Sequence, residues 1–157
     1  MSSDLTAMDS SGWETVKKAL NQRVVITRSS LVPSFRNRVW LVETDVRPVV
    51  VKRSLSGLSA VEFETTLLAK KAGLLVPYPL YMDRDYIVSE FISGERCSRL
   101  VSAMFNTAAA EGIGRWLGGF HDSMESFGRP LAMRDAVLDN FIMHEGEVFG
   151  VDLEDTS

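Results

Sequence analysis

The stretch that decides the fold is Arg134-Asp135-Ala136-Val137-Leu138-Asp139-Asn140, and it leads into two short apolar runs at residues 141–143 and 148–151. Between these runs lies His144-Glu145-Gly146-Glu147, which is typical of a β-hairpin turn. A hairpin returns the chain to its starting point, so Asn140 and Asp152 are expected at the same end of the ribbon. Asp135 would lie on the loop that precedes it. Amide and carboxylate oxygens gathered in this way suit Mg²⁺, and a plain surface loop and hairpin is the alternative.

This pattern of Arg-Asp, an Asn five residues later and an Asp after the second strand resembles the catalytic and metal-binding segments of the protein-kinase-like superfamily. It is most similar to the atypical branch: RIO kinases, aminoglycoside phosphotransferases and the small kinase of the tRNA threonylcarbamoyl-adenosine machinery. The resemblance implies that Asp135 accepts the proton of the attacking hydroxyl, while Asn140 and Asp152 hold Mg²⁺ on the phosphates of ATP. Two positions depart from the usual pattern, because Met133 replaces a His and Asp-Leu-Glu replaces Asp-Phe-Gly.

The first half of the chain is predicted to form a helix followed by a small antiparallel sheet. Ser11-Gly12-Trp13-Glu14 has the form of a capping box, and apolar residues follow it at helical spacing. Apolar and β-branched runs then predict five strands, at residues 24–26, 39–42, 48–51, 78–82 and 86–92.

A second helix is predicted between the third and fourth strands. Ser59-Ala60-Val61-Glu62 is another capping box, and the helix is expected to run from Ala60 to about Ala72 and to stop at Gly73. At 100° per residue, Glu64 points near the middle of an apolar arc and Glu62 points roughly the opposite way. The arc consists of Ala60, Val61, Phe63, Leu67, Leu68 and Ala72.

A carboxylate aimed into an apolar face is costly unless it is paired, so Glu64 calls for a cation. Lys52, which ends the third predicted strand, is the predicted partner. The alternative leaves Lys52 in solvent and pairs Glu64 with Lys71 on its own helix. The resemblance implies that Lys52 binds the nucleotide phosphates and that Glu64 orients it.

Two further segments are expected to contact the nucleotide. Residues 28–38 stand where kinases carry a glycine-rich loop but contain no glycine, so Ser34, Arg36 and Arg38 are the expected phosphate contacts, and a plain basic hairpin is the alternative. Residues 89–94 resemble the linker between kinase lobes, which implies that Glu90 and Ile92 lie at the adenine edge. Without the resemblance, residues 89–94 form an edge strand that runs into a turn.

The second half is predicted to contain a long helix from Asn106 to about Met124. Its apolar residues have only the catalytic loop and the hairpin, residues 141–151, to cover them. Since exposed apolar patches usually mark an interface, a homodimer or a complex with another protein is expected. The alternative is that the N-terminal helix around Trp13 folds back over this surface.

Composition limits the classes of protein. At 157 residues and 45% apolar, the chain can bury one core or two small lobes. The net charge of −4 gives no general basic footprint for nucleic acid. Cys97 is the only cysteine, which excludes a disulfide framework and fits a reducing cytoplasm. The sequence shows neither a signal-peptide pattern nor an apolar run long enough to span a membrane.

The expected fold is therefore α+β, protein-kinase-like and two-lobed. Residues 1–11 form a flexible tail, residues 12–92 an N-lobe with a five-stranded antiparallel sheet and helix C, and residues 93–157 a reduced, mainly helical C-lobe with the catalytic hairpin. The expected function is ATP- and Mg²⁺-dependent phosphate transfer to a hydroxyl acceptor. A protein Ser/Thr is preferred, because a protein substrate brings surface that so short a chain lacks. The alternative is a pseudokinase or nucleotide-binding regulatory module that acts through a protein partner.

Overall fold

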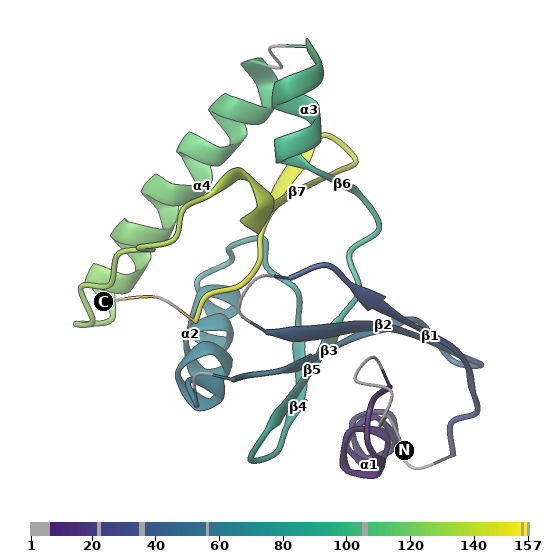
Figure 1. The fold of residues 1–157 in the computed structure, drawn as a ribbon. Helices are drawn as coiled ribbons and strands as arrows, with labels where there is room; N and C mark the ends of the chain where they lie inside the picture. The colour runs from purple at the N-terminus through teal and green to yellow at the C-terminus, as the bar shows by residue number, and fades with distance from the viewer. Residues whose placement is uncertain are drawn as a thin grey trace. The chain divides into compact units, whose positions relative to one another are not determined.

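The computed structural model describes residues 7–21, 23–34, 37–55, 57–104, 107–154 and 156, with the backbone alone for residues 101–104. These residues form a mixed α+β fold (Figure 1) that divides into two compact units. Unit 1 contains the chain up to Phe63 together with Pro79–Phe91, and unit 2 contains Glu64–Tyr78 and the chain from Ile92 onwards. The predicted α+β fold class with a five-stranded antiparallel sheet is confirmed.

Unit 1 is built on this sheet, whose strands follow the order β1-β2-β3-β5-β4. Facing residues on neighbouring strands point to the same side of a sheet. Val51 faces Trp40 and Val88, whereas Lys52 faces Val39 and Ile87, so Val51 and Lys52 lie on opposite faces. The strands are β1 (Ile26–Val32), β2 (Arg38–Thr44), β3 (Val49–Arg53), β4 (Pro79–Met82) and β5 (Tyr86–Glu90).

Helix α1 (Ser10–Ala19) covers the face that carries Val51. The helix begins after Asp9, whose carboxylate accepts a hydrogen bond from Gly12 N at 3.0 Å and so caps the first turn. The core under α1 contains Met8, Val16, Trp40, Val42, Val49, Val51, Tyr86 and Val88. On the other face, half-buried Val39, Leu41 and Val50 accompany Lys52 and Ile87.

Three predicted boundaries in unit 1 are wrong. Strand β1 continues to Val32, so much of the predicted loop at residues 28–38 is strand. Its middle residues are all exposed, and an edge strand of this kind lacks the alternation of buried and exposed positions that identifies a strand in sequence. Lys52 lies inside β3 rather than at its end, and Asp9 caps α1 in place of Ser11.

Unit 2 combines the later part of helix α2 (Ser59–Lys71) with the second half of the chain. As predicted, α2 stops at Gly73, which has a φ of +84° and belongs to a Schellman cap: Leu74 N donates to Ala69 O at 3.0 Å. The later elements are β6 (Glu95–Arg96), α3 (Cys97–Met104), α4 (Thr107–Ser126), the 3₁₀ turn η1 (Leu138–Asn140), β7 (Phe141–His144) and β8 (Glu147–Gly150). The sequence predicted α4 and the hairpin but not β6 or α3, and the predicted helix cap at Asn106 lies outside the described residues.

Trp116 of α4 is the centre of the core of unit 2. Its ring stacks on Phe120 with centroids 5.4 Å apart and meets Phe141 edge-on at 5.6 Å. Gly150 lies against this ring so closely that a Cβ atom there would overlap it. The carbonyl of Leu75 accepts hydrogen bonds from Trp116 Nε1 at 2.8 Å and from Gly150 N at 3.0 Å. These bonds hold α4, the hairpin and the segment after α2 together.

The premise that α4 leaves its apolar face uncovered is wrong. Ile113, Trp116, Phe120 and Met124 are all buried within the core of unit 2. Helix α1, the alternative source of cover, packs against β4 and β5 of its own unit. An interaction with a partner stays a prediction, but exposed apolar residues on α4 no longer support it.

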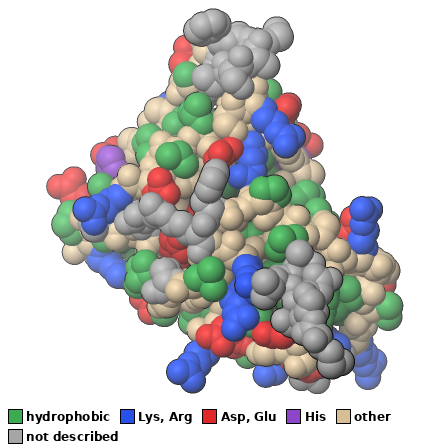
Figure 2. Space-filling view, viewed as in Figure 1, with side chains coloured by type: hydrophobic (Ala, Val, Ile, Leu, Met, Phe, Trp, Pro, Cys, Tyr) green, Lys and Arg blue, Asp and Glu red, His purple; other side chains and the backbone are tan. Residues whose placement is uncertain are grey.

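The described helices are too short or too polar to span a membrane, and the face in view carries charges of both signs. None of the helices in the described part of the chain combines the length and apolar character needed to cross a bilayer. On the face shown in Figure 2, acidic and basic side chains are mixed with hydrophobic and other ones.

Candidate functional site

The loop that carries Asp135 is held by hydrogen bonds to its own backbone. Met133, where the loop begins, is buried and pairs with Thr156 in an isolated antiparallel bridge. The carbonyl of Asp135 accepts hydrogen bonds from Val137 N at 2.8 Å and from Asn140 Nδ2 at 2.9 Å. The Asn140 side chain therefore closes the loop, and its own orientation is fixed by the same bond.

The predicted hairpin brings the chain back to Asn140. Its two-residue turn has positive φ at Glu145 (+50°) and Gly146 (+82°), which is typical of a type I′ turn. Strands β7 and β8 then pair in register up to Phe141 and Gly150, and Val151 N donates to Asn140 O at 2.8 Å. Within unit 2 these bonds bring the Asp135 loop, Asn140 and Val151, the residue before Asp152, together.

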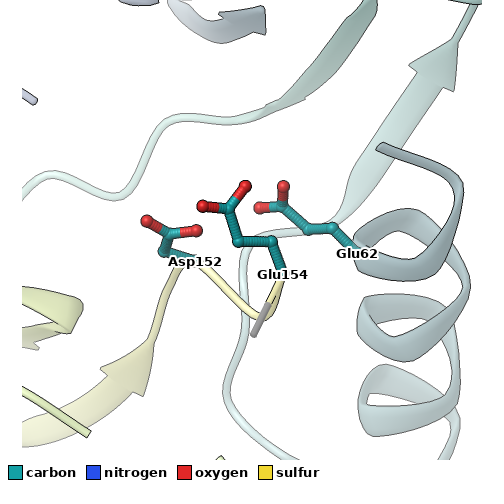
Figure 3. A group of neighbouring side chains, drawn as sticks. All are labelled: Glu62, Asp152 and Glu154. Atoms are coloured by element: carbon teal, nitrogen blue, oxygen red, sulfur yellow. The ribbon is translucent and has the colours of Figure 1, made fainter. Parts of the chain in front are cut away.

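Asp152 leaves the hairpin in a left-handed conformation, with a φ of +63°. Few residues other than glycine adopt this conformation, and an outlier of this kind often marks a functional site. The next residue, Leu153, is buried in the core of unit 2, and Glu154 is buried as well. Carboxylate oxygens of Asp152 and Glu154 lie within 4.8 Å of each other (Figure 3). Two carboxylates this close suit a divalent cation with oxygen ligands.

Lys52 pairs with Glu62, the carboxylate drawn on α2 in Figure 3, and not with Glu64. Lys52 Nζ lies 2.8 Å from Glu62 Oε2, and each residue is 8% exposed. The side chain of Glu64 is 64% exposed and lies 4.0 Å from Arg129 Nη1. The prediction of a Lys52–Glu64 pair is therefore wrong, and so is the alternative that leaves Lys52 in solvent.

The error has a physical cause in the composition of α2. Its apolar residues are spread around the helix, and Val61 and Leu67 are exposed. The buried positions are Ser59, Glu62, Thr65 and Ala69, spaced three or four residues apart. Because the first three of these are polar, hydrophobic periodicity cannot identify the buried face, and the ion pair with Lys52 replaces apolar contact there.

The remaining predicted contacts lie at strand ends or outside the described residues. Ser34 follows β1 and is exposed, while its neighbours Phe35 and Arg36 are not described. Glu90 ends β5 and is half-buried, and Ile92 is buried. Their roles toward a nucleotide stay predictions.

Sequence reasoning missed the roles of two carboxylates. Glu62 was assigned only to a helix cap, and Glu154 was noted only as a departure from Asp-Phe-Gly. Strand alternation could not have identified Glu154, because the left-handed backbone of Asp152 interrupts the extended conformation between the two carboxylates.

A second charged cluster lies on the face of β3 that α1 covers. Arg53 Nη1 lies 3.5 Å from Asp9 Oδ2, and its guanidinium carbon lies 5.6 Å from the ring centroid of Tyr86. The hydrogen bond from Gly12 N holds the pKa of Asp9 below its usual value. Burial, with the neighbouring Asp9 carboxylate, raises the pKa of Tyr86 to about 12.

Comparison with known proteins finds structural similarity only. No protein-family model matches this chain, and no curated protein matches it. A similar solved structure is the complex of Rv3197 with erythromycin from Mycobacterium tuberculosis, with a TM-score of 0.67 and 14% sequence identity over 94% of this chain and 51% of that chain. This chain therefore spans about half the length of the Rv3197 chain. At such low identity the similarity shows a shared fold and nothing about activity.

Proposed function

We propose that this chain is a kinase-like phosphotransferase, which binds ATP with Mg²⁺ and transfers the γ-phosphate to a hydroxyl group, preferably of a protein serine or threonine. One observation carries the proposal. The side chain of Asn140 donates to the carbonyl of Asp135, and the backbone of Asn140 accepts from the residue before Asp152. These bonds support the proposal, in which Asp135, Asn140 and Asp152 would act together in phosphate transfer.

The donor atoms of this site fit Mg²⁺. Because Asn140 Nδ2 donates to Asp135 O, Oδ1 is the Asn140 atom that would bind a metal. Asp152 adds a carboxylate, with Glu154 beside it. Hard oxygen ligands of this kind favour Mg²⁺ over zinc. When bound, Mg²⁺ would neutralise negative charge on the nucleotide phosphates.

Asp135 would accept the proton of the acceptor hydroxyl. Its backbone is held by Val137 N and Asn140 Nδ2, so the loop is preorganised without a contribution from the acceptor. The side chains of Val137 and Leu138 are exposed beside it. An acceptor residue carried on a protein surface could therefore approach this loop, which supports the preference for a protein substrate.

Lys52 would bind the α- and β-phosphates, with Glu62 as the carboxylate that orients it. The ion pair lies on the sheet face opposite α1, where Val39 and Val50 are half-buried. An ammonium group next to a partly open apolar surface suits a ligand that joins a planar base to phosphates. Ser34, Glu90 and Ile92 remain proposed nucleotide contacts.

A second function, that of a pseudokinase or nucleotide-binding regulatory module, is favoured by the absence of glycine from residues 28–38. Glycine allows backbone amides to approach phosphate closely, so a glycine-free segment binds the transferred phosphate less tightly. Such a module would bind nucleotide and act through a protein partner without transferring phosphate.

Equilibrium titration of the purified chain with ATP, in Mg²⁺ and in EDTA, tests the proposal together with transfer of labelled phosphate to a generic protein substrate. Tighter ATP binding in Mg²⁺ together with transfer is the expected result. Binding without transfer would favour the regulatory module, and no ATP binding in either condition would overturn both functions. Because the similar Rv3197 structure is an erythromycin complex, erythromycin is titrated in parallel as a hydroxyl-bearing ligand.

A further inference from the structure

Asp139, the residue before Asn140, is held by side chains from two other elements of unit 2. Ser98 Oγ, in the first turn of α3, donates to Asp139 Oδ1 at 2.5 Å. Arg96, at the end of β6, donates from Nη1 to the backbone carbonyl of Asp139 at 3.4 Å, and the same nitrogen lies 3.9 Å from Asp139 Oδ1. Both the side chain and the backbone of Asp139 are therefore anchored.

This anchor holds a short element that has little stability of its own. The 3₁₀ turn η1 contains only Leu138–Asn140, and no side chain caps its start at Val137. Its internal hydrogen bond, from Asn140 N to Val137 O, is 2.9 Å long. A single 3₁₀ turn has poor hydrogen-bond geometry and is stable only where its surroundings fix it. The orientation of Asn140 is therefore set from two sides, by its own bond to Asp135 O and by what holds the neighbouring Asp139.

We infer that Ser98 and Arg96 are positioning residues that act through Asp139 to keep Asn140 in the orientation a metal ion requires. This inference rests on the proposed function, in which Asn140 binds Mg²⁺. Groups that orient metal ligands from outside the coordination shell typically change metal affinity by about 10- to 100-fold when they are removed. Ser98 and Arg96 never touch the metal in this scheme.

Because the anchor is exposed, its role in positioning Asn140 can be distinguished from a role in the stability of the fold. The side chains of Arg96 and Asp139 are 41% and 50% exposed. Ion pairs with this exposure contribute little to stability. Loss of the anchor should therefore change the Mg²⁺ requirement far more than it changes unfolding.

The experiment measures ATP affinity as a function of Mg²⁺ concentration, ATP affinity in EDTA, and melting temperature. The test variants are Ser98→Ala and Arg96→Ala. Ser98→Thr is the conservative variant, which keeps the hydroxyl. Matched controls on α4 are Ser126→Ala, which removes a hydrogen bond to Ser123 O, and Arg115→Ala, which removes a surface pair with Glu111.

Ser98→Ala and Arg96→Ala are expected to raise the Mg²⁺ concentration for half-maximal ATP binding about tenfold. ATP affinity in EDTA and the melting temperature should match those of the controls, and Ser98→Thr should restore the wild-type Mg²⁺ response. If the test variants behave like the controls, or if their Mg²⁺ response falls only in step with their melting temperature, the inference is overturned and the proposed function stands. If the wild-type protein shows no Mg²⁺-dependent ATP binding, the proposed function fails and the inference fails with it.

Discussion

Lys52 Nζ and Glu62 Oε2 lie 2.8 Å apart, and only 8% of each residue is exposed. A buried ion pair of this kind stabilises a fold only while both members are present, because either one alone is an uncompensated charge removed from water. Glu64, on the same helix, is solvated and lies near Arg129. Removal of Glu62 is therefore expected to destabilise the fold far more than removal of Glu64, although the two residues are separated by only one position.

Glu62→Ala is expected to lower the free energy of unfolding by about 3–5 kcal/mol, the usual cost of breaking a buried pair from one side. Glu64→Ala is the matched control and should change it by less than about 0.5 kcal/mol. Urea denaturation of both variants measures the difference. Similar small effects in the two proteins would contradict the pairing of Lys52 with Glu62.

The left-handed backbone of Asp152 predicts a difference between two substitutions that both remove its carboxylate. Asp152→Ala should be less stable than Asp152→Gly by about 1–2 kcal/mol, because a Cβ atom strains the left-handed conformation and glycine avoids this strain. The comparison is made by urea denaturation in EDTA, so that metal binding does not enter. An alanine variant as stable as the glycine variant would show that this conformation is not maintained.

Substitutions of Asp152 and Asp135 should impair different steps, the first Mg²⁺-dependent ATP binding and the second phosphate transfer. Asp152→Asn removes a charge that would hold Mg²⁺, so the gain in ATP affinity on adding Mg²⁺ should disappear. Asp135→Asn should leave that gain largely intact and abolish phosphate transfer, since Asp135 would accept the proton of the acceptor hydroxyl. ATP titrations and a transfer assay on the same preparations test this division. Equal loss of ATP binding in both variants would refute it.

Gly150→Ala should destabilise unit 2, because the added Cβ atom would overlap the Trp116 ring. Overpacking of this kind typically costs about 1–3 kcal/mol. The control is Gly118→Ala at an exposed position of helix α4, where nothing lies within 4 Å of the added atom. That change should stabilise the chain by up to about 1 kcal/mol, because alanine is the better helix former. Thermal melting of the two variants should therefore shift in opposite directions.

The raised pKa of Tyr86 predicts that the protein loses stability at alkaline pH. Its pKa is raised to about 12, whereas a tyrosine in the unfolded chain ionises near pH 10. Between these values the native state keeps a proton that the unfolded state releases, so stability falls as the pH rises above about 10. Tyr86→Phe should show a weaker alkaline decline than the wild type in denaturation measured from pH 8 to 11. If the stability of both proteins declines equally with pH, the pKa of Tyr86 is not raised.

The features that the sequence predicted well depend on local signals. The β7–β8 hairpin follows from Glu145-Gly146 between two apolar runs, and the end of α2 follows from Gly73. The hydrogen bond between Val151 and Asn140 then follows from hairpin geometry. Each signal lies within a few residues of the feature that it specifies, so no knowledge of distant contacts is needed.

The features that were missed depend on distant contacts. The choice of Glu62 over Glu64 is made by Lys52, which belongs to a strand and not to the helix itself. Strand β6 contains two residues and exists because β7 pairs with it, more than 40 residues later in the chain. Gly94, just before β6, lies against the backbone of Met143, where a Cβ atom would collide with the carbonyl oxygen. A glycine alone in the sequence does not say which strand approaches it.

Unit 2 is assembled from two separate pieces of the chain, since residues 79–91 between Tyr78 and Ile92 belong to unit 1. The carbonyl of Leu75 accepts hydrogen bonds from Trp116 and Gly150, the first of which spans 41 residues. During synthesis, Leu75 therefore emerges long before either donor, and the strands β4 and β5 are made in the interval. No single cut of the chain can yield both units whole, so their folding cannot be studied by expressing the two halves apart.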